Sequence, residues 1–182
     1  MLQRLVLIAA GLALLAVIIF YAAGAALPAE VSASASRTIA ASPESVYDLV
    51  GHLDRWPEWT TWNAEQHPGL TLTFPGRREG TGARFEWRLG ERGGSGAIEV
   101  NTAERGRGVG YLVQGPAPER VVAAEGVISL DPADGGGTRI SWIHRGELRS
   151  TRQRWQGIGL ERAIREDMEA SLARLADLLA TP

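Results

Sequence analysis

The feature that most constrains the fold is the amphipathic segment Leu160–Ala180 near the C-terminus. Its apolar or small side chains recur at three- and four-residue spacings, which places them on one stripe of an α-helix. The stripe consists of Leu160, Ile164, Met168, Ser171, Leu172, Leu175, Leu178 and Leu179, with Arg162, Glu166, Glu169 and Asp177 opposite. Because an isolated helix of this length is marginal in water, it requires an apolar surface to pack against. We predict one long helix that covers the rest of the domain.

Segments that alternate between apolar and polar residues supply this surface. In Ala83–Leu89, apolar side chains occupy every second position and charged side chains lie between them. This period gives a strand one packed and one wet face, which is typical of an antiparallel sheet. Similar segments are Leu70–Phe74, Ile98–Val100, Val109–Val113, Val122–Leu130 and Ile140–His144. The predicted fold class is α+β, a curved antiparallel sheet around the C-terminal helix with a cavity between them.

The segment Val122–Leu130 has small residues at the centre of its inward face, namely Ala124 and Gly126. Small inward residues often mark a place where another group approaches the backbone closely. We predict that a helix or a ligand lies there.

The chain begins with an uncharged apolar run, Leu5–Ala26, whose 22 residues are long enough as a helix to cross a hydrocarbon core of about 30 Å. A cleaved signal peptide is the alternative, with Ala23–Ala25 as the small-residue cleavage site, but its apolar part is usually about 7 to 15 residues long. We predict an uncleaved anchor over residues 1–27. Arg4 lies on the short side, which by the positive-inside tendency leaves the C-terminal domain outside the cytoplasm, on the periplasmic side of a bacterial inner membrane.

After this run, residues 28–36 are predicted to be a linker, followed by a first strand near Ser36–Ala40. A short helix follows, since Ser42 suits the N-cap and Pro43 the first helical position. Its buried face is Val46, Leu49, Val50 and Leu53. Pro57 prevents a simple continuation and begins a second short helical turn.

Five motifs then carry a family resemblance. They are Ser42-Pro-Glu-Ser-Val46, Leu53-Asp-Arg-Trp-Pro-Glu-Trp59 with Trp62, Gly82-Ala-Arg-Phe-Glu-Trp87, Glu119-Arg-Val-Val122 and Gly137-Thr-Arg-Ile-Ser-Trp142. With these motifs and the final helix, the chain resembles the polyketide cyclase/dehydratase-like group of the START-related SRPBCC (Bet v 1-like) superfamily, and residues 37–182 form the corresponding domain.

The resemblance implies a helix-grip fold. Such a fold has about seven antiparallel strands, two short helices after the first strand, and a C-terminal helix lying over a hydrophobic pocket. Similar members often carry an N-terminal membrane segment. The family has no universal catalytic set, so the resemblance transfers no catalytic residue to this chain.

Composition excludes several function classes. The chain has 19 basic and 21 acidic residues, and without Arg4 the count is 18 against 21, a net charge of −3. A nucleic-acid-binding domain would normally have a basic surface. The absence of cysteine excludes disulfides, thiolate metal sites and thiol catalysis. The sequence also lacks a metal-binding or dinucleotide-binding motif, and we expect neither a metal nor a cofactor.

His144 is the one polar residue that strand parity directs into the pocket, because it shares a face with Ile140 and Trp142. A neutral imidazole there could anchor a ligand oxygen or act as a general base, and a histidine satisfied by one hydrogen bond within the core is the alternative. Asp167 borders the helix stripe, either orienting His144 or lying in solvent.

Aromatic and apolar residues complete the predicted site. Trp56, Trp59 and Trp62 either form a ligand-stacking gate or lock the short helices onto the sheet, the second role suiting Trp56 and Trp59 better than Trp62. The predicted ligand-binding residues are Trp62, Phe74, Phe85, Trp87, Tyr111, Trp142, His144 and Met168.

Two functions are compatible with this sequence. The first is a membrane-anchored domain that binds a small hydrophobic ligand such as a lipid, isoprenoid or polyketide-like molecule. The second is a cyclase or dehydratase in which His144 is the acid/base. Because the sequence offers one candidate acid/base residue and no established partner for it, binding is favoured. A domain with a filled core is the third alternative, which a pocket of about 300 Å³ or more would argue against.

Overall fold

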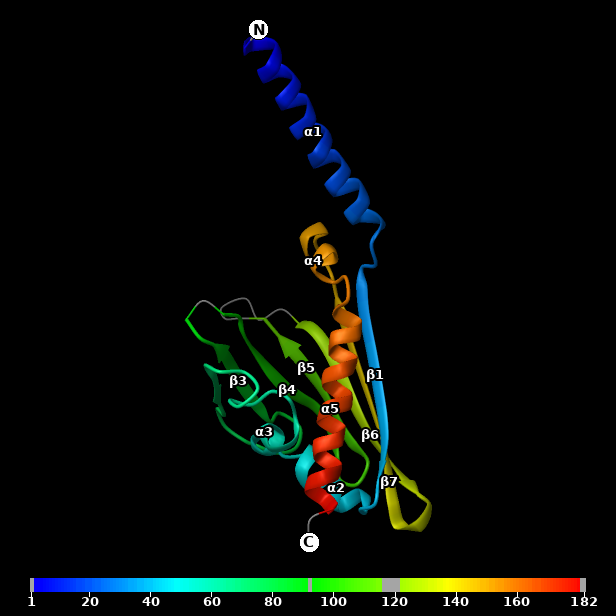
Figure 1. The fold of residues 1–182 in the computed structure, drawn as a ribbon. Helices are drawn as coiled ribbons and strands as arrows, with labels where there is room; N and C mark the ends of the chain where they lie inside the picture. The colour runs from blue at the N-terminus through cyan, green and yellow to red at the C-terminus, as the bar shows by residue number, and fades with distance from the viewer. Residues whose placement is uncertain (1, 92, 116–121, 181–182) are drawn as a thin grey trace.

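The computed structural model describes residues 2–91, 93–115 and 122–180 of the chain (Figure 1). Most of the Glu119–Val122 motif lies outside these residues. The elements in chain order are α1 (Leu2–Ala26), β1 (Glu30–Ile39), α2 (Pro43–Val50), η1 (Leu53–Arg55), α3 (Trp56–Trp59), β2 (Leu70–Thr73), β3 (Arg84–Leu89), β4 (Ser95–Glu104), β5 (Gly108–Gln114), β6 (Val122–Ala133), η2 (Asp134–Gly136), β7 (Gly137–Glu147), α4 (Thr151–Gln156) and α5 (Leu160–Ala180).

A seven-stranded antiparallel sheet forms the body of the domain, in the order β1-β7-β6-β5-β4-β3-β2. The long helix α5 has the predicted bounds and runs along β1 on one face of the sheet (Figure 1). Ala33 and Ala35 of β1 are buried, and their short side chains let a helix approach the sheet closely. The predicted α+β helix-grip fold is therefore confirmed.

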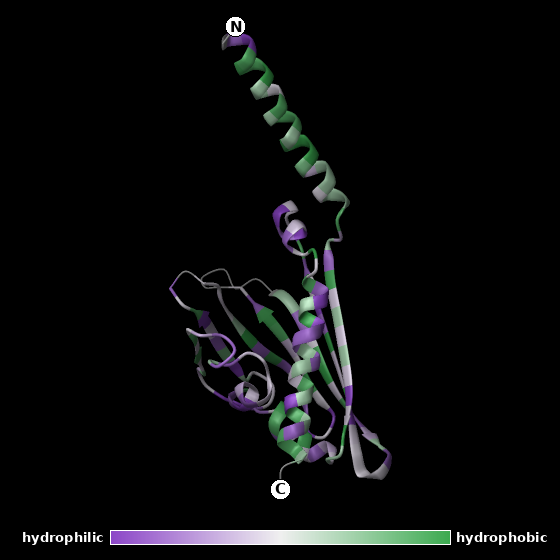
Figure 2. Ribbon diagram, in the orientation of Figure 1, coloured by the Kyte–Doolittle hydropathy of each residue, from purple (hydrophilic) through white to green (hydrophobic). Residues whose placement is uncertain are grey.

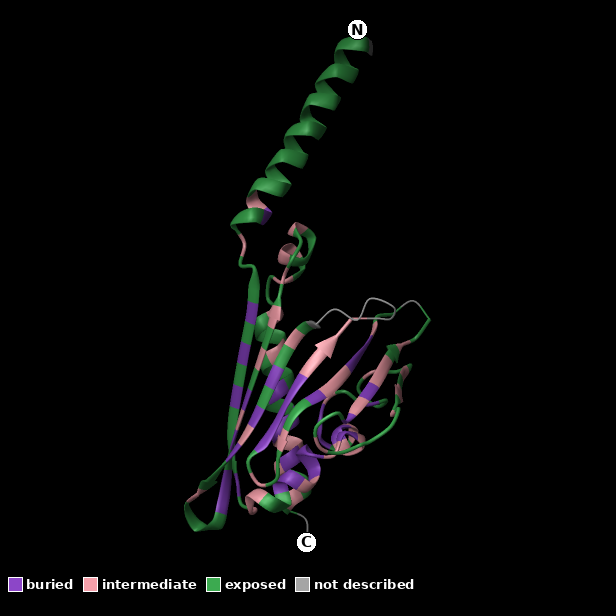
Figure 3. Cartoon of the chain, turned by 180° about the vertical axis from the view of Figure 1, so that it is seen from behind, coloured by how far each residue is buried: buried purple, intermediate pink, exposed green. Residues whose placement is uncertain are grey.

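The first strand is longer than predicted, because β1 begins at Glu30 and not near Ser36. The residues predicted as a linker, 28–36, therefore lie largely within the sheet. Buried Val31, Ala33 and Ala35 alternate with exposed serines, as the banding of this strand in Figure 3 shows. The prediction was wrong because alanine and serine differ too little in hydropathy for the alternation to stand out.

The N-terminal helix α1 projects away from the domain and is apolar along nearly its whole length (Figure 2). Within the described residues, one helical segment, Gln3–Ala26, is long and apolar enough to cross a membrane. A signal sequence near the N-terminus has the same features.

Two short helical segments follow β1, as predicted. The Ser42 hydroxyl caps α2 by accepting a hydrogen bond from the Ser45 amide at 3.2 Å. The Trp56 indole then donates to the Val50 carbonyl at 2.8 Å, which ties α3 to the end of α2. Helix α3 lies beside α5.

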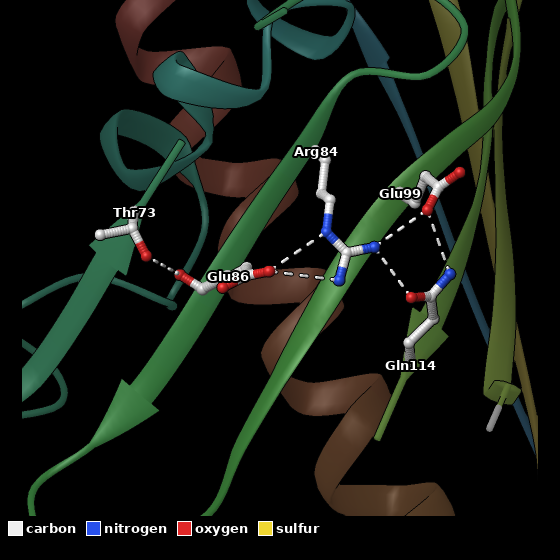
Figure 4. Close-up of polar contacts among 5 residues, drawn as sticks. All are labelled: Thr73, Arg84, Glu86, Glu99 and Gln114. Atoms are coloured by element: carbon white, nitrogen blue, oxygen red, sulfur yellow. Dashed lines mark hydrogen bonds and ion pairs between the residues drawn. The ribbon is translucent and has the colours of Figure 1, made fainter. Parts of the chain in front are cut away.

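The outer face of the sheet is held by polar contacts (Figure 4). Arg84 of β3 donates to the Glu99 carboxylate of β4 at 2.9 Å and to the Gln114 side-chain oxygen of β5 at 2.8 Å. Gln114 in turn donates to Glu99 at 3.1 Å. Alternation thus separates this wet face from the packed face under α5, as the sequence predicted.

Two features of the C-terminal region differ from the prediction. Leu178, assigned to the apolar stripe, is 42% exposed, because it lies at the edge of the stripe in the last turn of the helix. The short helix α4 was not predicted. It begins with a capping box in which the Ser150 hydroxyl accepts from the Gln153 amide and Gln153 accepts from the Ser150 amide.

Candidate functional site

A cavity of about 350 Å³ lies between the sheet, α3 and the first half of α5. Apolar and aromatic side chains form most of its wall, with few polar groups among them. The lining residues are Trp56, Pro57, Thr60, Thr61, Trp62, Leu72, Phe85, Trp87, Ile98, Tyr111, Val113, Trp142, His144, Leu160, Ala163, Ile164, Asp167, Met168 and Ser171.

Seven of the eight predicted ligand-binding residues line this cavity: Trp62, Phe85, Trp87, Tyr111, Trp142, His144 and Met168. Phe74 does not. Its ring packs against Phe85 with centroids 5.9 Å apart, and it lies just beyond the end of β2. Parity placed it on the packed face, but that face extends past the cavity.

Several lining residues were not named as ligand-binding from the sequence. Ile98 and Val113 could have been found from strand parity, and Leu160 and Ile164 from the helix stripe. Thr60 and Thr61 follow α3 in an irregular segment, where no periodicity indicates which way a side chain points. The sequence carried no signal for them.

The polar part of the cavity is a chain of hydrogen bonds through Tyr111. The Trp142 indole donates to the Tyr111 hydroxyl oxygen at 2.9 Å, and this oxygen lies 3.3 Å from His144 Nδ1. Since an indole can only donate, the hydroxyl proton of Tyr111 is available for His144 Nδ1. We therefore assign His144 the tautomer that carries its proton on Nε2, which leaves Nε2 as the ring's donor for a ligand.

Burial determines the protonation states of Tyr111 and His144. Desolvation raises the pKa of Tyr111 well above its usual value, with the Trp142 hydrogen bond opposing it to a smaller extent. Desolvation also lowers the pKa of His144, because the charged imidazolium loses its hydration. Both side chains are therefore neutral near pH 7 and can take part in hydrogen bonds without supplying a charge.

The space expected at Gly126 is filled by the protein itself. A Cβ atom at this position would clash with the Tyr111 ring, the side chain of the paired residue on β5. The glycine therefore makes room for Tyr111, and the prediction that a helix or ligand lies there was wrong. The sequence does not indicate this occupant, because Tyr111 reaches Gly126 through the pairing of β5 with β6.

The tryptophans have different roles. Trp56 and Trp59 are buried, and their rings pack edge-on with centroids 5.7 Å apart. Trp59 also packs against Trp142 at 5.6 Å, which locks α3 to the sheet. Trp62 is 38% exposed and lies 5.2 Å from the Trp87 ring, so it forms part of the cavity rim.

Asp167 also lines the cavity but is exposed. Within the described ranges, the hydrogen-bond partner of His144 is Tyr111, and no hydrogen bond or ion pair joins His144 to Asp167. The same part of the chain contains no cluster of three His, Asp or Glu side chains able to hold a metal ion. The geometry thus provides a largely apolar chamber in which Tyr111 and His144 form a neutral hydrogen-bonded pair, with Thr60, Thr61, Asp167 and Ser171 as other polar lining residues.

Comparisons with known proteins agree with this architecture. Residues 30–180 match the family model described as polyketide cyclase/dehydrase and lipid transport. No curated protein is similar enough to count as a match.

Among solved structures, the protein of unknown function SA2116 from Staphylococcus aureus is 14% identical, with a TM-score of 0.61, covering 84% of this chain and 94% of its own. The Aha1 dimer from Colwellia psychrerythraea is 20% identical, with a TM-score of 0.55 and coverage of 83% and 97%. Protein Ms6760 from Mycobacterium smegmatis is 16% identical, with a TM-score of 0.56 and coverage of 82% and 90%. At these identities the likeness concerns the fold alone.

Proposed function

Since the chain belongs to the polyketide cyclase/dehydrase and lipid transport family, we propose that it is a membrane-anchored domain that binds a small hydrophobic ligand between the sheet and α5. The ligand class is a lipid, isoprenoid or polyketide-like molecule with one hydrogen-bond acceptor. The domain lies outside the cytoplasm, on the periplasmic side of a bacterial inner membrane.

The observation that carries this proposal is the largely apolar cavity with the neutral Tyr111–His144 pair in its wall. Its volume of about 350 Å³ falls within the range of about 300 to 1,000 Å³ typical of small-molecule sites. A domain with a filled core would have no such space. The Nε2 donor of His144 suits a carbonyl or hydroxyl oxygen, and the surrounding aromatic rings suit an apolar body.

Retention of α1 is supported by its contacts with α4. Gly24, at the centre of the candidate cleavage site Ala23–Ala25, is buried because Thr151 and Trp155 pack over it. The small residue therefore has a packing role. A segment that is removed after export would have no use for a matching contact on the mature domain.

The enzymatic alternative requires His144 to move protons. Its partner is the neutral Tyr111 hydroxyl, whereas an oriented catalytic base more often has a carboxylate partner. For a carrier, His144→Leu removes one hydrogen bond to the ligand, worth about 0.5 to 1.5 kcal/mol of affinity. For an enzyme, the same change lowers turnover by about 10² to 10⁴-fold while binding persists.

The direct test is native mass spectrometry of the full chain, extracted from membranes in mild detergent, with Ala163→Trp and Ala170→Trp as a matched pair. Both alanines are exposed on α5, but only Ala163 lines the cavity. We expect a retained apolar molecule in the wild type and in Ala170→Trp, and its loss in Ala163→Trp. Equal retention by both variants would contradict the proposed site.

A further inference from the structure

The short helix α4 lies against the C-terminal turns of α1 (Figure 1). The Trp155 ring stacks on Phe20 with centroids 5.6 Å apart and planes inclined by 17°. Its indole nitrogen donates to the Phe20 carbonyl at 3.2 Å. Arg154 donates to the Ala25 carbonyl at 3.1 Å. Two consecutive residues of α4 thus contact α1 at two different positions along the axis of α1.

The connection between α1 and the sheet is short. Only Leu27, Pro28 and Ala29 separate the end of α1 from β1, and the Leu148 amide donates to the Ala29 carbonyl at 2.7 Å. The domain therefore cannot move far from the end of α1. Any surface beside the last turns of α1 shares their depth in the membrane.

If α1 spans the bilayer, the positions of these contacts along α1 determine the depth of α4 in the membrane. At about 1.5 Å per residue, Phe20 is about 9 Å below Ala26 along the helix axis, and Ala25 is in the last turn. Trp155 then lies at the boundary of the acyl chains, where tryptophan is enriched. Arg154 lies above it, at the level of the phosphate groups.

The chemistry of this segment matches a lipid headgroup layer. Arg152 and Arg154 are the charged residues of α4, which has no acidic residue, and arginine side chains are attracted to anionic phosphates. Two residues after α4, Ile158 is 62% exposed. An exposed isoleucine beside arginines and a tryptophan is typical of an interfacial segment.

We propose that residues 151–159 dock in the headgroup layer of the same phospholipid bilayer that α1 spans. The inference rests on the proposed anchoring of α1. Because Leu160 begins α5 and lines the cavity, this docking places the α4 end of the cavity next to the bilayer. A hydrophobic ligand can then pass between membrane and cavity with a short exposure to water.

The absence of cysteine in the chain permits a clean test with single-cysteine nitroxide labels. The full-length protein is reconstituted into vesicles of phosphatidylcholine and phosphatidylglycerol, with the label at Ile158→Cys, Ile18→Cys or Glu169→Cys. Collision of the nitroxide with oxygen, which concentrates in the bilayer, is compared with collision with a water-soluble nickel chelate. We expect position 158 to favour oxygen, as position 18 does, and position 169 on the exposed side of α5 to favour the chelate.

The three positions separate the possible failures. A bilayer signal at position 18 with an aqueous signal at position 158 would overturn the docking of residues 151–159 and leave the anchor intact. An aqueous signal at position 18 would instead overturn the anchoring itself and, with it, this inference.

A second variant, Gly24→Leu, adds a side chain where Thr151 and Trp155 pack. We expect it to move the label at 158 toward water while the label at 18 stays in the bilayer, and an unchanged signal at 158 would contradict the role of the contact between α1 and α4.

Discussion

The two halves of α5 cover the same sheet but have different surroundings. In the first half, Leu160, Ile164 and Met168 line the cavity. In the second half, Leu172 and Leu175 are 1% and 0% exposed and belong to the continuous core. The apolar stripe is similar in both halves, so the difference comes from what the sheet and α3 place beneath it.

Ser171 lies at the boundary between the two halves. Its hydroxyl lines the cavity and accepts a hydrogen bond from the Thr61 amide at 3.0 Å. This bond holds the segment after α3 against the helix. One helix can therefore serve as the wall of a chamber and as the core of a domain, provided that a neighbouring segment is held away from the sheet along part of its length.

The largest effect that separates the two halves is expected from truncation of the core half. Leu175→Ala should lower the free energy of unfolding by about 2 to 5 kcal/mol, because it leaves a cavity in a close-packed region. Ile164→Ala should cost less, since Ile164 is only partly buried and already borders empty space. Denaturant titration measures both, with the exposed Glu169→Ala as the control. Equal losses for Leu175→Ala and Ile164→Ala would refute the division of the helix.

An intermediate effect on stability is expected from substitution of Gly126, which lies on the sheet opposite the cavity-lining half of α5. Gly126→Ala places a methyl group against the Tyr111 ring, and overpacking of this kind typically costs about 1 to 3 kcal/mol. The displaced ring also weakens the hydrogen bond to His144. We expect lower stability together with a changed near-ultraviolet circular dichroism signal from Trp142 and Tyr111.

The control for this variant is Gly76→Ala, at an exposed position with open space around it. Gly76 has a positive φ of 88°, so its substitution tests backbone strain without a clash. If Gly126→Ala left the aromatic signal unchanged, Tyr111 would not depend on the space that Gly126 provides.

Much of the fold could be predicted because it depends on periodicity. The bounds of α5 follow from the stripe of apolar residues, and Phe85 and Trp87 point inward because they alternate with Arg84 and Glu86. The start of β1 was missed where alanine and serine gave a weak alternation. The helix α4 was missed because its six residues are too few to show a period of 3.6.

The candidate site was predictable only in part. Strand parity gave Tyr111, Trp142 and His144, which do meet in the structure. It gave no partner for His144, because Tyr111 comes from a strand 33 residues away in sequence. The contribution of the segment after α3 depends on irregular backbone, and the contact between α4 and α1 depends on tertiary packing.

The smallest effect is expected from the pH dependence of His144, whose imidazole keeps partial contact with solvent. Burial lowers its pKa in the folded protein, whereas in the unfolded chain the pKa is about 6.5. Between these two values the unfolded state binds more protons, so stability rises with pH. The contribution is therefore fully present above about pH 6.5 and is lost as the pH falls toward the lower value of the folded state.

Unfolding titrations of the wild type and His144→Leu, at about pH 7.5 and about pH 5 on either side of the reference histidine pKa, isolate this effect. His52 and His67 are present in both proteins, so their contributions cancel in the difference. We expect the wild type to lose more stability at the lower pH than the variant does, because only the wild type has a histidine at position 144 that the unfolded chain protonates more readily than the folded protein does. If the two proteins lost the same amount, His144 would not be held neutral by the cavity.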